Sequence, residues 1–262
     1  MWTRATLKEN GKIAFKRNWL TCVLVCVVTS FLGGEAFGGT VNFNRNARTS
    51  QSQMGNLSGL TTADLQNMLM QSMVYLSIML IALIIALVIQ TVLGNIVTVG
   101  NHRYFMENRE HRTDVNKLFW AFSGGRYKNV LITMFLRGLK IALWSLLFVI
   151  PGIVKSYEYM MVPYILAENP HIDQQRAFEL SREMMNGHKM EAFVLQLSFI
   201  GWEILGALTW GILTVAYVSP YMSATHAEFY TAIKTEALHK GFTTRTELPG
   251  FDDSVIDADV IV

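Results

Sequence analysis

Two apolar runs, each long enough to cross a membrane, place the strongest limit on what this chain can fold into. Residues 70–98 contain VYLSIMLIALIIALVIQTVLGNIV, and residues 129–150 read NVLITMFLRGLKIALWSLLFVI. A helix needs about 20 mainly apolar residues to cross ~30 Å of hydrocarbon. Charge is also scarce, because charged residues make up 16% of the chain, whereas a soluble domain has about 25%. The sequence therefore predicts an all-α, polytopic membrane helical bundle.

The remaining apolar sequence divides into four further runs, which brings the prediction to about six transmembrane helices. The stretch 189–233 is too long for one crossing, and GALTWG at 206–211 suits a tight turn within it. The first run has a short apolar core after basic residues, so it is also compatible with a signal peptide. The six predicted spans are 18–37, 70–98, 129–150, 152–168, 189–207 and 210–233.

The distribution of lysine and arginine predicts how the spans are oriented. These residues concentrate in short cytoplasmic segments of membrane proteins. With the N-terminus inside, most of the 22 Lys and Arg residues fall in the inner segments, and both ends of the chain are then cytoplasmic. The predicted organisation is a basic N-terminal segment 1–17, a membrane domain 18–233 with an outer loop 39–69 and inner loops 99–128 and 169–188, and a tail 234–262.

The inner loop 169–188 carries the clearest helical pattern outside the spans. Asp173 suits an N-cap and Gly187 a position just after the C-terminus. Ala177, Leu180 and Met184 recur at helical spacing and form one apolar face. We expect an amphipathic helix between spans 4 and 5, lying at the inner membrane interface. A linker helix packed beneath the bundle is an equally good interpretation of the same pattern.

The two terminal segments differ in character. Arg4, Lys8, Lys12 and Lys16 recur every fourth residue and form a basic stripe on a short helix that can face anionic lipid. The end of the chain, ELPGFDDSVIDADVIV, alternates acidic and apolar residues after a Pro-Gly break. We expect the 234–262 tail to be disordered; docking as a strand on the sheet edge of a partner is the alternative.

Three stretches together resemble a known family. They are IPGIVKSYEYMMVPYILAENP, AFELSREMMNGHK and LSFIGWEILGALTWGILTVAYVSPYMSATHAEFY. These resemble the bacterial integral membrane family called domain of unknown function 975, strongly over 129–233 and loosely at the N-terminal spans. The resemblance implies a multi-pass protein of the bacterial plasma membrane. It implies no activity and no functional residues.

Several ionisable residues lie inside the predicted spans. An ionisable side chain in the membrane centre costs about 2.5–3.5 kcal/mol on insertion scales, so it is usually paired or faces a polar cavity. Matching depths pair Lys140 with Glu158 or Glu203, and Arg137 with Glu228 or His226. The candidate polar network is Arg137, Lys140, Glu158, Glu203, His226 and Glu228.

Three further residues complete this picture. Lys155 is close enough to the membrane surface to act as an interface anchor, and Pro163 and Pro220 are candidate kinks beside the charges. Two interpretations of the network remain open. The pairs either hold the helices in register, or they line a polar cavity for a proton or a charged substrate.

The sequence contains no pattern for an enzyme. HExxH, a P-loop and GxSxG are absent, so we predict no catalytic, cofactor-binding or metal-binding residue. Cys22 and Cys26 lie four apart in an apolar run and are interpreted as small hydrophobic residues. The net charge of +2 is too small to indicate nucleic acid.

The predicted function is a non-enzymatic accessory or interaction protein of the envelope. The alternative is a transporter or exporter of a small, lipid or peptide substrate through a cavity between spans 3 to 6, and a membrane enzyme is the third class left open. Expected partners are the lipid bilayer, with anionic lipid at the basic inner segments, and a membrane-protein partner or a second copy of the chain.

Overall fold

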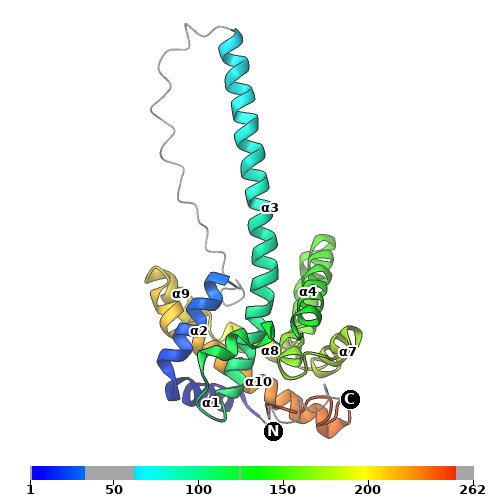
Figure 1. Cartoon of the computed structure of the whole chain (residues 1–262). Coiled ribbons are helices and arrows are strands. Elements are labelled where there is room, and N and C mark those ends of the chain that lie inside the picture. The colour runs from blue at the N-terminus through cyan, green and yellow to red at the C-terminus, as the bar shows by residue number, and fades with distance from the viewer. Residues whose placement is uncertain (1, 33–61, 124, 252–262) are drawn as a thin grey trace.

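The computed structural model describes residues 2–32, 62–123 and 125–251 (Figure 1). All the regular structure in these ranges is helical, which confirms the predicted all-α class. The helices are α1 (Arg4–Arg17), α2 (Trp19–Leu32), α3 (Thr62–Glu107), η2 (Val115–Phe122), α4 (Tyr127–Leu147), α5 (Val149–Glu158), α6 (Val162–Glu168), α7 (Gln174–Met184), α8 (Lys189–Leu197), α9 (Ile200–Leu208), η3 (Thr214–Val218) and α10 (Ser219–Lys240).

The long helix α3 is the most extended feature of the molecule. It has 46 residues, which corresponds to about 69 Å at 1.5 Å per residue. Its first part projects far from the other helices, on the same side as the α4–α5 hairpin (Figure 1). Large apolar side chains there, such as Leu76 and Met79, are 73% and 76% exposed, whereas its last turns are buried in the body. A helix that is apolar on all sides needs lipid or protein around it.

Fewer helices than six are long and apolar enough to cross a membrane. Among the described residues, α4 and the continuous segment Lys189–Leu208, which joins α8 and α9, meet both conditions. A third span results only if α1 and α2, which are bent by 97° relative to each other, are counted as one. The projecting part of α3 contributes a shorter apolar helix, Gln66–Ala82. About six spans are therefore not supported.

The predicted spans 152–168 and 210–233 are both interrupted. The first is divided between α5 and α6, with a break after Glu158, and Pro163 lies in the first turn of α6. The second contains a π-helical segment, η3, and Pro220 lies in the first turn of α10. Pro163 thus begins a helix after a break, because its ring fits the first turn and not a helix interior. At Pro220 the chain stays helical from residue 212 to residue 240, with the π-helical segment η3 directly before the proline.

The predicted tight turn at GALTWG is confirmed. Helix α9 ends at Leu208, and the two residues that follow Thr209 have positive φ angles, 55° at Trp210 and 83° at Gly211. Glycine adopts this left-handed region without steric cost. The turn reverses the chain and leaves Trp210 93% exposed at the tip of the hairpin.

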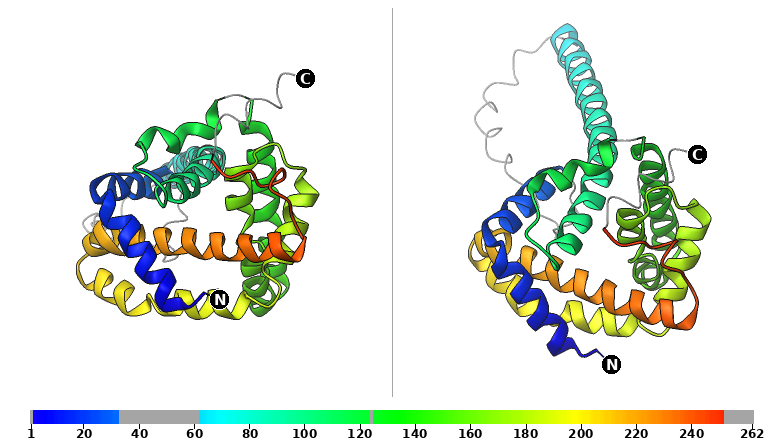
Figure 2. Two further views of the ribbon diagram at one scale, coloured as in Figure 1. Left: turned by 90° about the horizontal axis from the view of Figure 1, so that it is seen from below. Right: turned by 60° about the horizontal axis from the view of Figure 1, so that its bottom comes forward.

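Helices α1 and α10 cross at close range beneath the body (Figure 2). A Cβ atom on Gly11 would lie 2.7 Å from Thr225 Oγ1 and 2.9 Å from Thr225 Cα, so a glycine is needed at this crossing. Cys22 and Cys26 on α2 are free thiols and fully buried, which confirms their interpretation as small core residues.

The amphipathic helix between residues 173 and 186 is confirmed as α7, but its predicted place at the membrane interface is not supported. The Asp173 side chain accepts a hydrogen bond of 3.2 Å from the backbone N–H of Arg176, and Gly187 has a φ of 88°. The apolar face, including Ala177 and Leu180, is completely buried in the protein core. That face is therefore not available to lipid, which favours the linker helix packed beneath the bundle.

The described part of the predicted tail is ordered. Residues 241–251, which we call the docked C-terminal segment, pack on the body with Leu248 only 1% exposed. Glu247 accepts hydrogen bonds of 2.7 and 3.1 Å from the Arg176 guanidinium. The prediction of disorder over 234–262 is thus wrong for 234–251. Residues 252–262, and residues 39–61 of the predicted outer loop, lie outside the described residues.

Candidate functional site

A polar cavity lies among the helices of the body. It has two chambers of about 150 Å³ and 510 Å³, which share the side chains of His102, Tyr164, Gln196 and His226. Together the chambers receive residues from α2, α3, α4, α5, α6, α8, α9 and α10. The larger volume is within the range of about 300–1,000 Å³ that is typical of small-molecule sites.

The smaller chamber is lined by buried polar atoms that have no hydrogen-bond partner in the protein. They are Thr98 Oγ1, Asn101 Oδ1 and His226 Nε2, from α3 and α10. A buried polar group without a partner costs about 1–3 kcal/mol. Three such atoms belong to residues that line this chamber. Every residue in its lining except Met222 carries a polar group, so the chamber suits a molecule that forms hydrogen bonds.

The two chambers differ in the charge that they offer. Glu203 on α9 lines the smaller chamber, and Arg137 on α4 lines the larger one. The Nε of Arg137 donates a hydrogen bond of 3.0 Å to the carbonyl oxygen of Tyr159, which fixes the guanidinium at the break between α5 and α6. A molecule that occupied both chambers would meet a carboxylate at one end and a guanidinium at the other.

Aromatic and polar contacts hold the walls of the larger chamber in place. The rings of His102 and Tyr164 have centroids 4.1 Å apart, and Tyr164 stacks on Tyr230 at 5.1 Å with an angle of 16° between the planes. The Tyr157 hydroxyl, also in the lining of this chamber, donates a hydrogen bond of 2.8 Å to Gln196 Oε1 and thereby joins α5 to α8. Such side chains position a ligand with little loss of conformational entropy.

The cavity brings together three of the six candidate residues, Arg137, Glu203 and His226. The ion pairs that the sequence predicted for the candidate residues are not the ones that form. Glu228 was expected to pair with Arg137, but it instead accepts hydrogen bonds of 2.7 and 3.1 Å from Arg109. Arg109 is the second residue after α3, which continues past the predicted end of its span and so brings this arginine to Glu228 on α10.

The predicted pairing of Lys140 with Glu158 is also replaced. Glu158 forms ion pairs with three other cations, Lys155, Arg182 and Lys189. Lys155, the candidate interface anchor, therefore also belongs to a cluster of ion pairs around the buried Glu158 carboxylate. The Lys140 ammonium lies 3.5 Å from the centroid of the Phe178 ring, a cation–π contact.

Sequence reasoning missed the wall that α3 contributes. The predicted span ended at residue 98 and assigned Asn101 and His102 to an inner loop, whereas the helix continues to Glu107. The signal was present, because no proline or glycine pair follows Gly100 to end the helix. Tyr164 and Gln196 gave no comparable signal, since neither residue type is unusual in its surroundings.

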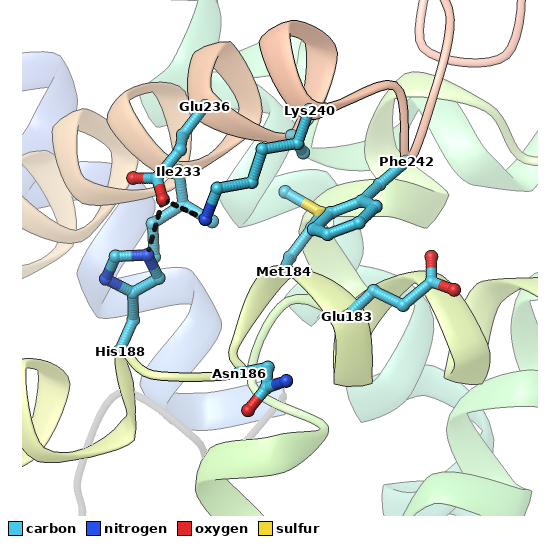
Figure 3. Close-up of a pocket in the computed structure, with 9 residues that line it drawn as sticks. Glu183, Met184, Asn186, His188, Ile233, Glu236, Lys240 and Phe242 are labelled. Carbon is cyan, nitrogen blue, oxygen red and sulfur yellow. Dashed lines mark hydrogen bonds and ion pairs between the residues drawn. The ribbon is translucent and has the colours of Figure 1, made fainter.

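A second hollow, between α7, α10 and the docked C-terminal segment, is too small to be a site (Figure 3). Its volume is about 10 Å³, and a cavity needs roughly 10–15 Å³ to hold one water molecule. In its lining, the Glu236 carboxylate pairs with Lys240 at 2.6 Å and with His188 at 3.2 Å. The hydrogen bond from Lys240 holds the pKa of Glu236 below its ordinary value. This cluster fastens α8 to α10.

No metal centre accompanies the cavity. Across the described ranges, no three His, Cys, Asp or Glu side chains are grouped closely enough to hold a metal ion. The chemistry that the cavity offers is hydrogen bonding and charge recognition, from the amide, hydroxyl, imidazole, carboxylate and guanidinium groups on its walls.

Comparison with known proteins identifies one relationship. Residues 1–237 match the family model described as a protein of unknown function (DUF975). Neither a curated protein nor a solved structure is significantly similar to the chain. The match covers every residue that lines the cavity, from Thr29 on α2 to His226 on α10.

Proposed function

We propose that this chain, which belongs to the DUF975 family of proteins of unknown function, is a multi-pass protein of the bacterial plasma membrane that carries a small polar or amphipathic molecule across it. The observation that carries this proposal is the smaller chamber, whose lining is polar apart from Met222 and includes Thr98, Asn101 and His226, each with a buried polar atom that has no protein partner.

The polar lining of the smaller chamber supports a ligand, because all of its residues except Met222 offer a hydrogen-bonding group. The opposite charges of Glu203 and Arg137 on the two chambers favour a ligand that carries charge or a strong dipole. The apolar helices α4 and α8–α9 beside the cavity supply the membrane surroundings.

The arrangement of the charges supports an orientation with both ends of the chain in the cytoplasm. The basic helix α1 and the end of α10 lie on the side of the body opposite to the free end of α3 (Figure 1). Lysine and arginine are retained on the cytoplasmic side during insertion. The cavity then lies toward the inner half of the membrane, and α3 reaches toward the outside.

The second candidate is an accessory or interaction protein of the envelope, and α3 favours it. Between residues 66 and 82, its side chains are exposed on all faces of the helix. A surface of this kind can contact another membrane protein or a second copy of the chain as readily as lipid. In that case the cavity would hold a ligand that is sensed and not moved.

Cysteine labelling distinguishes these functions, because Cys22 and Cys26 are fully buried and leave the native chain without an accessible thiol among its described residues. Met222→Cys places a thiol in the smaller chamber. The probe is a membrane-impermeant maleimide, applied to intact cells and separately to inside-out vesicles. Leu139→Cys, near the middle of the apolar helix α4 and 44% exposed, is the matched control and should react only after detergent solubilisation.

A carrier exposes its site to both sides in turn, so Met222→Cys should be labelled in cells and in vesicles. Labelling in vesicles alone contradicts transport and favours the accessory protein. If Met222→Cys reacts from neither side while the solubilised control reacts, the chamber is closed to water, and the proposal that it receives a polar molecule is wrong.

A further inference from the structure

The carboxylate of Glu158 is surrounded by cations from three helices. Lys155 Nζ lies 2.7 Å from Glu158 Oε1, Arg182 Nε lies 3.2 Å from the same oxygen, and Lys189 Nζ lies 2.8 Å from Oε2. The Glu158 side chain is only 7% exposed. One buried carboxylate thus gathers positive charge from α5, α7 and α8.

A fourth cation stands beside this group. Lys140 on α4 and Lys155 on α5 lie on the same aromatic ring, with their ammonium nitrogens 5.8 and 5.6 Å from the ring centroid of Tyr159. Within the described part of the chain, Glu158 is the only carboxylate in ion-pair contact with any of the four cations. The cluster therefore has three positive charges more than its own carboxylate neutralises.

Like charges this close to one another repel, and an anion that approached the cluster would relieve that repulsion. The cations can reach one. The Arg182 side chain is 57% exposed and that of Lys189 is 33% exposed. Arg182 uses Nε for Glu158, so the rest of its planar guanidinium can face an incoming oxyanion.

The cluster also lies next to an apolar surface. Helices α4 and α5 form a hairpin whose tip exposes Phe148 and Ile150, at 68% and 75%. Lys140 and Lys155 belong to the stems of the same hairpin. An apolar hairpin that carries cations at its base presents the two chemistries of a phospholipid, whose acyl chains are apolar and whose phosphate is anionic.

We propose that Lys140, Lys155, Arg182 and Lys189 form a binding site for a phosphate group, carried by the headgroup of an anionic phospholipid. Glu158 holds three of the cations in place and is not itself a contact to the lipid. This site is separate from the polar cavity, and it does not depend on what the cavity binds.

The test uses the full chain purified in a neutral detergent, with affinity followed by native mass spectrometry. The probes are short-chain phosphatidylglycerol, phosphatidylcholine of the same chain length, and inorganic phosphate. The test variant combines Lys140→Gln with Arg182→Gln. The control variant combines Lys12→Gln with Arg245→Gln, which removes the same charge from exposed positions elsewhere.

Phosphatidylglycerol should bind the native chain and the control variant equally, and its affinity for the test variant should fall by about tenfold or more. Phosphatidylcholine should bind more weakly to all three proteins. Equal binding of the two lipids, or unchanged affinity in the test variant, would overturn the site. Competition by inorganic phosphate at the same concentration as the lipid would overturn the lipid as its ligand. If the test variant does not fold, Lys140→Gln alone decides, because it breaks no ion pair.

Discussion

Substitution of Gly100 by alanine tests the close contact between α3 and η2. This contact fixes the position of α3, which lines the cavity. A Cβ atom at residue 100 would lie 1.9 Å from the carbonyl oxygen of Leu118 and 2.6 Å from its carbonyl carbon. Both atoms belong to the backbone of η2, so no side-chain rotation relieves the clash. The two helices must move apart, which disturbs the fully buried Arg103 that stacks 3.9 Å from the Trp120 ring.

We expect Gly100→Ala to destabilise the fold by about 1–3 kcal/mol, as is usual when a packed core receives an extra methyl group. In a chain of this size, 1 kcal/mol corresponds to about 2–4 °C in Tm. Thermal unfolding of the detergent-purified protein, followed by tryptophan fluorescence, measures the shift.

Gly138→Ala in α4 is the matched control, since a Cβ there would meet nothing within 4 Å. It should leave Tm unchanged or raise it, because alanine is a better helix former by up to about 1 kcal/mol. If the two variants have the same Tm, the close contact between α3 and η2 does not exist in the folded protein, and the reasoning fails.

Three further predictions concern ion pairs. Reversing the charge of Arg109 or Glu228 alone should reduce the membrane abundance of a tagged protein, and reversing both should restore it; an unrecovered double variant would argue against the bidentate pair. Hydrogen bonds from its guanidinium partner on α7 hold the pKa of Glu247 below its ordinary value, so the stability it adds is complete above that value and is lost as pH falls through the lower folded-state pKa. The docked C-terminal segment should therefore become sensitive to an acid-active protease at low pH, and equal protection at neutral and acidic pH would refute this. Reversal of Glu158 should deplete the protein, and simultaneous reversal of Lys140 should not rescue it; rescue would restore the pairing predicted from sequence.

The features that the sequence predicted correctly depend on a few neighbouring residues. Asp173 caps α7 because its carboxylate reaches a backbone N–H three residues later, and Gly187 ends the segment because it adopts a left-handed conformation. The reversal at Trp210–Gly211 has the same local origin. Interactions between residues this close in the chain can be predicted from the sequence alone.

The predicted ion pairs failed because they relied on depth within uninterrupted spans. Helix α5 ends at Glu158, so counting residues from the membrane surface no longer gives its height. The break places this carboxylate beside Arg182 and Lys189, which were assigned to an inner segment. The pairing of Glu228 failed for a related reason, because α3 continues below its predicted span and places Arg109 within reach. Long-range pairing depends on where helices break, and hydropathy alone does not show that.

The two groups of charged residues should therefore respond differently to substitution, and this difference separates structural from functional roles. Glu158 and Glu228 are held in ion pairs that join separate segments of the chain, so their loss leaves several cations without a carboxylate partner and reduces the amount of folded protein. Glu203 and His226 face the cavity and form no ion pair within the described residues, so their neutral variants can fold with the ligand site altered. A variant such as Glu203→Gln that accumulates normally but changes the labelling of Met222→Cys would assign the cavity to function. If variants of both groups lose membrane abundance equally, all of these residues are instead needed for folding.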